Sequence, residues 1–383
     1  MGKEKQGSEH LAESLHDEEK RIEHGNPLLR EADKTNQFIT IGEIMLRLTP
    51  PNYEKIRMAS SFEASYGGSE ANIALALANL GIDSTFFTVI PNNSLGKSAI
   101  RMLRSNDVHC TPVILSTPEQ TPTHRMGSYY LETGFGIRAS KVIYDRKHSA
   151  ISEFDFETVD LDSLLEGYTW LHLSGITPAL SKGCQKLVLS SLKIAQKKGI
   201  TVSFDGNFRS TLWNWEEARN FCTQCLPYVN VLMGIEPYHL WRDEDDHSKG
   251  DKKDGVPLQP SYEQQDEIFQ AFIDRYPNLT CIARHVRYAH SGSENSLKAF
   301  MWYEGHTFES KLFTFNILDR VGGGDAFASG LIYAIMHRYK PMDIVNFAVA
   351  SSAIKHTIRG DANITDDVES IRNLMNMNYD IKR

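Results

Sequence analysis

The sequence predicts an α/β protein with a mostly parallel central sheet, helices on both faces of that sheet, and a small separate β-sheet. Short apolar, β-branched runs alternate along the chain with longer runs whose apolar residues recur at helical spacing. Such alternation indicates parallel strands joined by crossover helices, which cover both faces of the sheet. The alternation breaks between residues 121 and 149, where short strands surround a glycine turn. This segment predicts the small sheet.

The individual elements follow from the same alternation. We expect strands over residues 38–48, 85–90, 169–173, 200–204, 229–233 and 279–283, and helices over residues 69–80, 96–105, 182–198 and 264–276. Further short strands are expected over residues 124–131 and 141–144, and residues 47–66 and 121–149 are predicted to form a lid. Ligands of parallel α/β sheets bind at the carboxyl ends of strands. The loops that follow strands are therefore the first places to look for a site.

Composition and charge exclude several classes of protein. The chain has 383 residues and a formal net charge of -8, and it lacks a dense block of Lys and Arg, which argues against a nucleic-acid-binding protein. No apolar run approaches the roughly 20 residues of a membrane-spanning helix. The five cysteines are scattered and odd in number, so they predict no disulfide framework and favour the cytoplasm.

Two polar stretches stand apart from the alternating pattern. Residues 1–37 are rich in Glu and Lys and predict a mobile N-terminal extension or partner-facing arm, which leaves residues 38–383 as the folded domain. Residues 243–261 contain a run of charges. Charge runs are more often solvated loops than functional acidic sites, so we expect a surface loop there.

The segment from Asp319 to Gly330 carries the strongest signal for chemistry. Its three successive glycines, Gly322, Gly323 and Gly324, lead into an apolar helical run. Unobstructed backbone N–H groups at a helix N-terminus form a cradle for an anion. Asp325 lies where that anion would bind, which predicts a general base that takes the proton of a hydroxyl during phosphoryl transfer. The alternative is an acidic residue that merely interacts favourably with the helix dipole.

Three other segments predict contacts to a small polar ligand. Gly67 and Gly68 precede a helix that carries Asn72, an amide suited to a sugar hydroxyl, although a glycine pair before a helix is often only a turn. Polar residues 205–209 follow a convincing strand and end in an arginine suited to a carboxylate or phosphate. A Tyr-x-Arg pair at residues 144–146 would also contact such a ligand if it lies on the lid. The alternative is that the pair belongs to an ordinary surface strand.

These segments, in this order, resemble the ribokinase-like sugar kinase family, and the resemblance extends from about Phe38 to the C-terminus. The glycine pair with its downstream Asn is one hallmark of that family. The opening segment 42–50 and the Arg-Val-Gly-Gly-Gly-Asp form of the catalytic segment look like those of 2-keto-3-deoxygluconate kinases. The family pattern D-T-x-G-A-G-D-x-F-x-x-G is matched at Asp319, Gly322, Gly324, Asp325, Phe327 and Gly330.

The resemblance implies a three-layer α/β/α fold with a small β-sheet lid, and ATP- and Mg²⁺-dependent phosphorylation of a terminal hydroxyl of this sugar acid. It also implies a homo-oligomer assembled through the lid. Asp325 would be the catalytic base, and the backbone of Gly322, Gly323 and Gly324 the anion hole. The implied sugar-acid contacts are Gly67, Gly68, Asn72, Tyr129, Tyr144, Arg146, Arg209 and Asp325, and the implied nucleotide contacts are Asn207, Gly322 and Gly324.

Several positions depart from the family pattern. Arg320 and Val321 stand where small hydroxyl-bearing residues are usual, and Gly323 replaces Ala. The family's N-x-x-E segment, associated with magnesium and phosphate, falls at residues 233–237, with Gly234 in place of the Asn and Glu236 as the possible metal-organising acid. The adenine-side residues 284–287 also lack the usual glycine-rich form.

Other motifs are better read as structure. Residues 92–98 imitate a phosphate-binding Walker A loop, but Pro91 takes the position of its first glycine and has no N–H to offer. The pair Cys222 and Cys225 has no partners at zinc-ligand spacing, so we expect buried thiols. His172 lies on an apolar strand and is interpreted as a core residue. Trp213 and Trp215 could line the site or simply pack.

Two alternatives remain open from the sequence. The first is the same phosphoryl transfer to a neutral sugar such as fructose or ribose. The second is a non-catalytic relative that binds a sugar or nucleotide and acts through its polar arm, a reading motivated by the altered segment 234–237.

Overall fold

A computed structural model describes residues 37–238, 252–253, 256–257, 259–365 and 367–378. The predicted N-terminal extension, apart from Gln37, and most of the predicted surface loop 243–261 lie outside the described residues.

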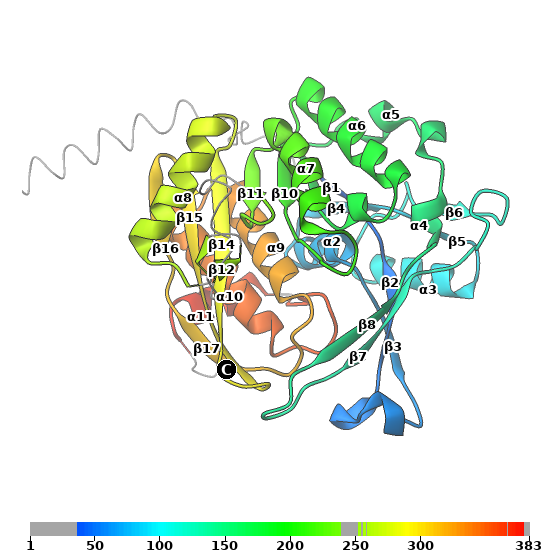
Figure 1. The fold of residues 1–383 in the computed structure, drawn as a ribbon, viewed down its shortest axis with the longest axis horizontal. Coiled ribbons are helices and arrows are strands. Elements are labelled where there is room, and N and C mark those ends of the chain that lie inside the picture. Colours follow the sequence, from blue (N-terminus) through cyan, green and yellow to red (C-terminus); the bar gives the residue numbers. More distant parts are fainter. Residues whose placement is uncertain (1–36, 239–251, 254–255, 258, 366, 379–383) are drawn as a thin grey trace, which may run out of the picture. The chain divides into compact units, whose positions relative to one another are not determined.

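The central element is a nine-stranded sheet in the order β16-β15-β14-β11-β10-β9-β1-β4, with β17 paired to β15 (Figure 1). The neighbouring strands β4, β1, β9, β10, β11 and β14 pair in parallel, and β15, β16 and β17 extend the sheet with antiparallel pairing. The mostly parallel sheet expected from the sequence is thus confirmed. The strands are β1 (Gln37–Ile41), β4 (Asp83–Phe87), β9 (Trp170–Ser174), β10 (Thr201–Asp205), β11 (Val231–Met233), β14 (Cys281–Ala289), β15 (Glu294–Tyr303), β16 (His306–Glu309) and β17 (Phe313–Asn316).

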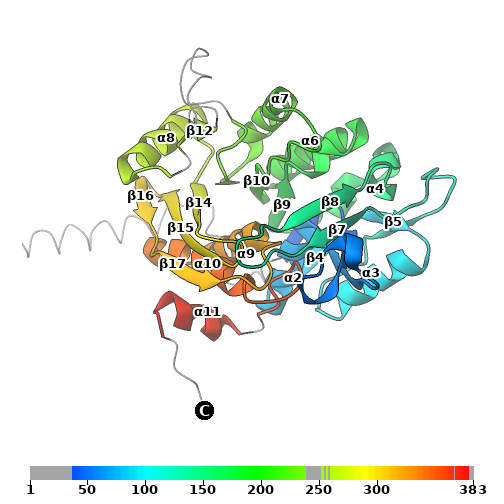
Figure 2. The same cartoon turned by 60° about the horizontal axis from the view of Figure 1, so that its bottom comes forward.

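Helices cover both faces of this sheet (Figures 1 and 2). On one face, α6, α7 and α8 share a buried apolar cluster with the strands, and α2, α9 and α10 pack together on the other. Within the described residues no helix is long and apolar enough to cross a membrane. The helices are α2 (Ser69–Asn79), α3 (Ser94–Arg104), α4 (Ala150–Glu153), α5 (Leu161–Leu164), α6 (Lys182–Lys198), α7 (Trp215–Cys225), α8 (Tyr262–Arg275), α9 (Gly323–Met336), α10 (Pro341–Lys355) and α11 (Val368–Met375).

Helix α6 illustrates how the local sequence sets an element. The Ser181 hydroxyl accepts a hydrogen bond from the Cys184 amide at 3.1 Å and so caps the first turn. Gly199 ends the helix in the left-handed conformation, with φ of 64°. Between these caps, buried residues recur at the spacing of one helical face, at Cys184, Leu187, Val188, Ser191, Leu192 and Ala195.

A separate four-stranded sheet has the order β3-β2-β7-β8 and contains β2 (Met45–Thr49), β3 (Glu63–Gly67), β7 (Ser128–Glu132) and β8 (Lys141–Asp145). The single strand expected over residues 38–48 is therefore wrong: the chain leaves the central sheet after Ile41 and enters the small sheet at Met45. Side-chain alternation could not reveal the break, because both strands are apolar. Two further pairs are β5 (Val89–Pro91) with β6 (Ile114–Ser116), and β12 (Lys252–Lys253) with β13 (Val256–Pro257).

The Walker-like segment, the cysteine pair and His172 have structural settings, as the sequence predicts. Asn93 caps α3 by accepting hydrogen bonds from the amides of Leu95 and Gly96, so the Walker-like segment is a strand-to-helix turn. Cys222 and Cys225 are buried free thiols. His172 is buried, and its Nδ1 lies 2.8 Å from the Ser203 hydroxyl.

Candidate active site

The glycine run of the predicted cradle forms the start of α9. Gly322 is the N-cap residue, with φ of 81°, and a Cβ at this position would overlap the backbone of Asp361. A Cβ on Gly323 would overlap the His356 ring, so glycine at this position allows the close approach of His356. The free N–H groups of a helix N-terminus and the helix dipole together favour a bound anion. The glycine run thus lies at a helix N-terminus, the arrangement that an anion cradle would need, and its binding of an anion stays a prediction.

Asp325 lies in the first turn of α9 and is partly buried. One of its carboxylate oxygens accepts a hydrogen bond from the Ser69 hydroxyl, and the other accepts one from the Asn72 side-chain amide, both at 2.7 Å. Burial raises the pKa of Asp325, while these hydrogen bonds and the charge of Arg209 lower it, and the net shift is upward. Asp325 is thus a fixed carboxylate that is more basic than an ordinary aspartate.

The predicted glycine pair allows a close approach of three chain segments. A Cβ at Gly67 would overlap the Asp361 side chain, and one at Gly68 would overlap the backbone carbonyl of Glu43. The Gly68 amide donates to the side-chain oxygen of Asn72 at 3.3 Å. Glycine at both positions therefore brings β3 and the start of α2 against the loop that carries Asp361, and it orients Asn72 toward Asp325.

The loop after β10 brings its polar residues to the same place. The Asn207 side-chain amide donates to the Ser69 hydroxyl at 2.9 Å, and its backbone N–H donates to Asp205 at 2.9 Å. Burial and then the charge of Asp325 raise the pKa of Asp205 to about 7, and Arg209 opposes that shift. Arg209 is exposed, and its positive charge lowers the pKa of both Asp205 and Asp325. Its Nη1 donates to the Phe208 carbonyl oxygen at 3.1 Å, and this exposed arginine is a candidate for binding an anionic ligand.

The structure gives the three predicted lid residues unequal settings. Tyr144 on β8 is 40 % exposed, and the Arg146 guanidinium lies 5.6 Å from the centre of its ring. Arg146 itself is buried and pairs with the carboxylate of buried Glu43, to which its Nε donates at 2.8 Å. Tyr129 is also buried and donates its hydroxyl hydrogen bond to Asp361. Of these three residues, only Tyr144 has an exposed side chain. A ligand carboxylate would have to compete with the Glu43 carboxylate for the Arg146 guanidinium.

Glu236, the acid predicted to organise a metal ion, lies after β11 and not after β10, the strand that precedes Asn207 and Arg209. Glu236 follows β11, is partly buried, and interacts electrostatically with Arg284. Across the described ranges there is no group of three or more His, Cys, Asp or Glu side chains that could hold a metal ion. A protein-only metal centre is therefore absent from this part of the chain, although Mg²⁺ bound to nucleotide phosphates needs only one or two protein carboxylates.

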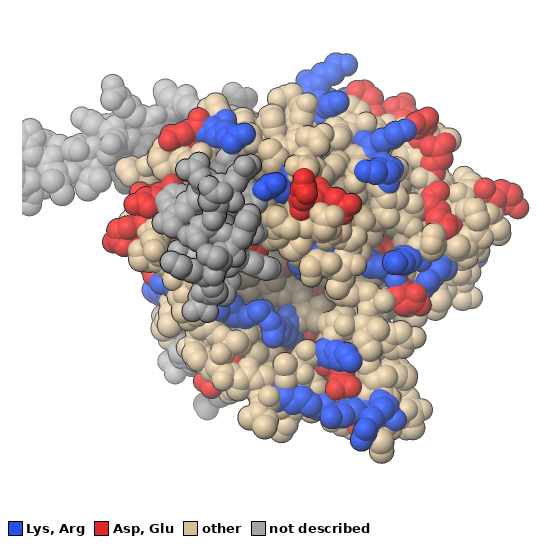
Figure 3. Space-filling view, in the orientation of Figure 1, with Lys and Arg blue, Asp and Glu red and all other residues tan. Residues whose placement is uncertain are grey.

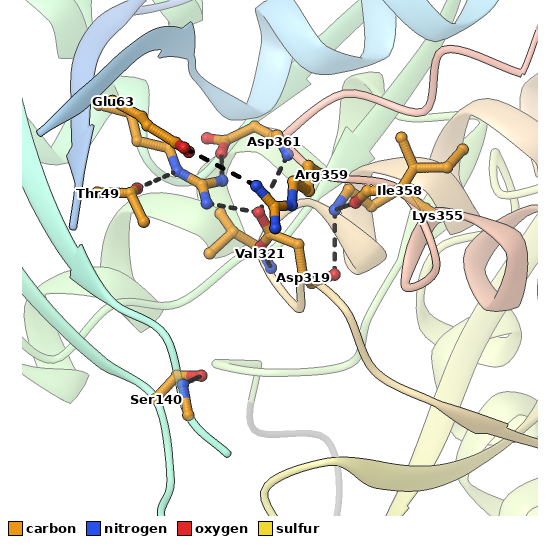
Figure 4. A network of polar contacts seen from close by, with 12 residues as sticks. Thr49, Glu63, Ser140, Asp319, Val321, Lys355, Ile358, Arg359 and Asp361 are labelled. Atoms are coloured by element: carbon orange, nitrogen blue, oxygen red, sulfur yellow. Dashed lines mark hydrogen bonds and ion pairs between the residues drawn. The ribbon is translucent and has the colours of Figure 1, made fainter. Parts of the chain in front are cut away.

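A buried charge network connects the small sheet to the cradle, and the sequence reading did not identify it (Figure 4). Arg47 on β2 donates to Asp319 and to Asp361, each at 2.5 Å. Burial lowers the pKa of Arg47, but the charges of Asp361 and Asp319 outweigh it and raise this pKa above its usual value. Asp319 also accepts hydrogen bonds from the amides of Val321 and Gly360. The network thus holds both segments that border the glycine run.

A cavity of about 260 Å³ lies beside this network, lined in part by Arg47, Glu63, Asp319 and Arg359. Asp325 does not line it, so it is a neighbour of the site and not its centre. The face seen in Figure 3 is hollowed between the central sheet's helices and the small sheet, and Lys and Arg side chains gather along that hollow. A basic hollow suits an anionic ligand.

The chain is similar to known carbohydrate kinases. Residues 35–237 match the family model described as pfkB family carbohydrate kinase. A solved 2-dehydro-3-deoxygluconokinase from Thermotoga maritima is 36% identical, with a TM-score of 0.80, over 89% of this chain and 99% of that one. A PfkB family carbohydrate kinase from Listeria grayi is 32% identical, with a TM-score of 0.79, over 89% and 100%. A 2-dehydro-3-deoxygalactonokinase from Haloferax volcanii is 28% identical over 88% of this chain and 96% of its own length.

The Arg47 network leads to a prediction about stability. Replacing Arg47 by Met leaves Asp319 and Asp361 buried without the cation that pairs directly with them, so we expect the free energy of unfolding to fall by about 3–5 kcal/mol. Lys198→Met, which removes the surface ion pairs with Asp162 and Glu166, is the control and should cost less than about 1 kcal/mol. Urea unfolding of both variants measures the difference. Equal losses in the two variants would contradict a structural role for the network.

Proposed function

The chain belongs to the pfkB family of carbohydrate kinases, and on that premise we propose that it phosphorylates 2-keto-3-deoxygluconate, also called 2-dehydro-3-deoxygluconate. The phosphoryl donor would be ATP, the acceptor the terminal hydroxyl, and the products ADP and the 6-phospho sugar acid. Support for this substrate comes from the Thermotoga maritima relative and from a Bacillus subtilis protein of the same name that is 25% identical over 84% of this chain.

The observation that carries the proposal is the position of Asp325 beside the glycine cradle. Asp325 takes the proton of the terminal hydroxyl as that oxygen attacks the γ-phosphorus. Ser69 and Asn72 hold the two carboxylate oxygens in place. The N–H groups of residues 322–324 stabilise the charge that develops on the transferred phosphoryl group. A base and an anion hole on one helical turn are what this in-line transfer requires.

Recognition of the sugar acid is assigned to residues around Asp325. Gly67, Gly68 and Asn72 would contact its hydroxyls, and the exposed Arg209 would bind its carboxylate. Tyr144 would lie against the sugar, with Tyr129 and Arg146 behind it. Because Arg146 already pairs with Glu43, we assign the larger share of carboxylate binding to Arg209.

The nucleotide would approach from the side of Asn207, Gly322 and Gly324. Mg²⁺ would enter with ATP, held mainly by phosphate oxygens and water, and would shield the charge of the phosphates. Glu236 is our candidate for a protein carboxylate near it.

The small sheet, with residues 47–66 and 121–149, is proposed as a lid on the kinase domain formed by residues 38–383. Apolar side chains of these segments are exposed, among them Val142 and Ile143 on β8 and Phe62 just before β3. A second copy of the chain could cover them, which supports a homo-oligomer assembled through the lid. The free, buried cysteines of the described residues support a cytoplasmic location, because thiols persist in a reducing compartment.

Replacing Asp325 by Asn tests the catalytic base. The amide keeps the shape of the side chain but cannot take the proton, so we expect kcat to fall by about 10² or more while the folded structure persists. Steady-state kinetics with ATP and the sugar acid measure kcat, and circular dichroism checks the fold. The exposed cap residue Asp160, changed to Asn, is the control. Turnover near that of the unchanged protein would refute the assignment of Asp325.

Replacing Arg209 by Ala tests recognition of the carboxylate. A charge-assisted hydrogen bond contributes about 1.5–3 kcal/mol, so we expect KM for the sugar acid to rise by about 10- to 100-fold. Arg125→Ala, which breaks an exposed pair with Asp145, is the control. Fructose, ribose and the C4 epimer of the sugar acid complete the substrate panel. If the Arg209 variant lost fructose and sugar-acid turnover equally, or if fructose were the better substrate, the sugar-acid assignment would fail.

The raised pKa of Asp325 predicts how turnover depends on pH. The base must be ionised, so kcat should fall as the pH drops through a pKa above the usual aspartate value of about 3.9. Arg209 lowers the pKa of Asp325. Its removal should therefore move the acid limb of the kcat profile to higher pH. A limb that stayed in place or moved to lower pH would contradict the electrostatic link between the two residues.

A further inference from the structure

Lys355 is a buried cation that the proposed chemistry leaves without a role. It is the last residue of α10, and its side chain is 0% exposed. Its ammonium group donates to the carbonyl oxygen of Asp319 at 3.1 Å and to that of Ile358 at 3.3 Å (Figure 4). Burying an ammonium group is costly unless its environment compensates it. A lysine in this position therefore requires an explanation.

The two carbonyls belong to the two segments that surround the glycine cradle. Asp319 opens the segment that leads into Gly322, and Ile358 opens the loop that reaches Asp361. That loop lies against the cradle, because a Cβ on Gly322 would overlap the Asp361 carbonyl. The Lys355 ammonium is therefore a direct bridge between the segment that carries the anion-binding amides and the loop packed behind it.

Neighbouring residues of α10 hold the same segment at other points. The His356 carbonyl accepts hydrogen bonds from the amides of Leu318 and Asp319, at 2.8 and 3.1 Å. The Ser352 hydroxyl donates to the Gly323 carbonyl at 2.7 Å. The end of α10 thus forms a continuous support beneath the cradle, with Lys355 as its charged member.

The charge balance beneath the cradle also depends on Lys355. Arg47 supplies one positive charge to two buried carboxylates, Asp319 and Asp361. Without a second cation this group would carry a net negative charge directly behind a loop that must accept a phosphoryl group. Burial lowers the pKa of Lys355, and the charges of Asp319 and Asp361 oppose that shift. The four groups are balanced when Lys355 is protonated.

We propose that Lys355 is a positioning residue for phosphoryl transfer: its ammonium joins the carbonyls of Asp319 and Ile358 and neutralises the carboxylates behind the cradle, so that the amides of residues 322–324 stay aimed at the phosphoryl group. The inference rests on the proposed function, since it assigns a supporting role to the same anion hole. Lys355 does not touch the reacting atoms and acts only through the backbone it holds.

The test compares Lys355→Met with a variant destabilised elsewhere. Methionine keeps most of the side-chain volume but has no charge and no donor. Leu192→Ala, in the buried face of α6 on the opposite side of the sheet, is the matched control for lost stability. For each full-length variant we would measure the thermal midpoint, kcat and KM for the sugar acid, and hydrogen–deuterium exchange of the segment 319–325.

We expect Lys355→Met to lower kcat at least about tenfold, with KM for the sugar acid changed less than about twofold. Outright loss of one anion-hole donor costs about 10²–10³ in kcat, and donors that are only misaligned should cost less. Exchange of segment 319–325 should become faster in this variant only. In Lys355→Ala, added methylammonium should restore part of kcat, because a small cation can occupy the vacated space. Leu192→Ala should lower the thermal midpoint while retaining kcat and the exchange pattern.

The proposal is overturned if kcat and exchange in Lys355→Met match those of the unchanged protein, or if Leu192→Ala reproduces both changes. An absence of methylammonium rescue would also count against a role for the charge. Failure of the unchanged protein to phosphorylate the sugar acid would refute the proposed substrate instead. In that case the exchange of segment 319–325, which needs no substrate, still decides whether Lys355 holds the cradle.

Discussion

The active-site geometry depends on the neutralisation of two buried carboxylates, Asp319 and Asp361. Arg47 contacts both and thereby joins β2 of the small sheet to the segment before α9 and to the loop after α10. The Asp361 carboxylate also accepts a hydrogen bond from the Tyr129 hydroxyl on β7. Asp361 packs so closely that a Cβ at Gly67 or Gly322 would overlap its atoms. Unpaired, either carboxylate would be costly to bury. One charge network therefore joins the small sheet to the glycine turn at the start of α9.

The chemistry follows from what this framework presents at the carboxyl ends of the strands. The start of α2 and the loop after β10 meet the N-terminus of α9, which gathers Ser69, Asn72, Asn207 and Arg209 around Asp325. The parallel pairing of β1, β9 and β10 places the carboxyl ends of these strands at one edge of the sheet. A basic carboxylate beside a helix N-terminus can accept a proton while neighbouring amides hold an anion, which is the combination that a sugar kinase needs.

Much of this could be predicted from the sequence, because local patterns carry it. The glycine run before an apolar helix, the alternation of strands and helices, and the polar ends of strands are all readable within a few residues. Side chains with distant partners were not predictable: the acids that engage Arg47 lie 272 and 314 residues away, and Glu43 pairs with a residue 103 positions on. The same holds for Arg146: its sequence pattern predicts a ligand contact but gives no sign of its buried partner, Glu43.

The central claim is that this site moves a phosphoryl group from ATP to the terminal hydroxyl of a sugar acid. Phosphorus NMR of a reaction containing the unchanged protein, ATP, Mg²⁺ and 2-keto-3-deoxygluconate tests it most directly. We expect a new phosphomonoester signal coupled to the terminal methylene protons, formed in equal amount to ADP. Formation of inorganic phosphate without a sugar ester, an ester at another carbon, or no consumption of ATP would contradict the account.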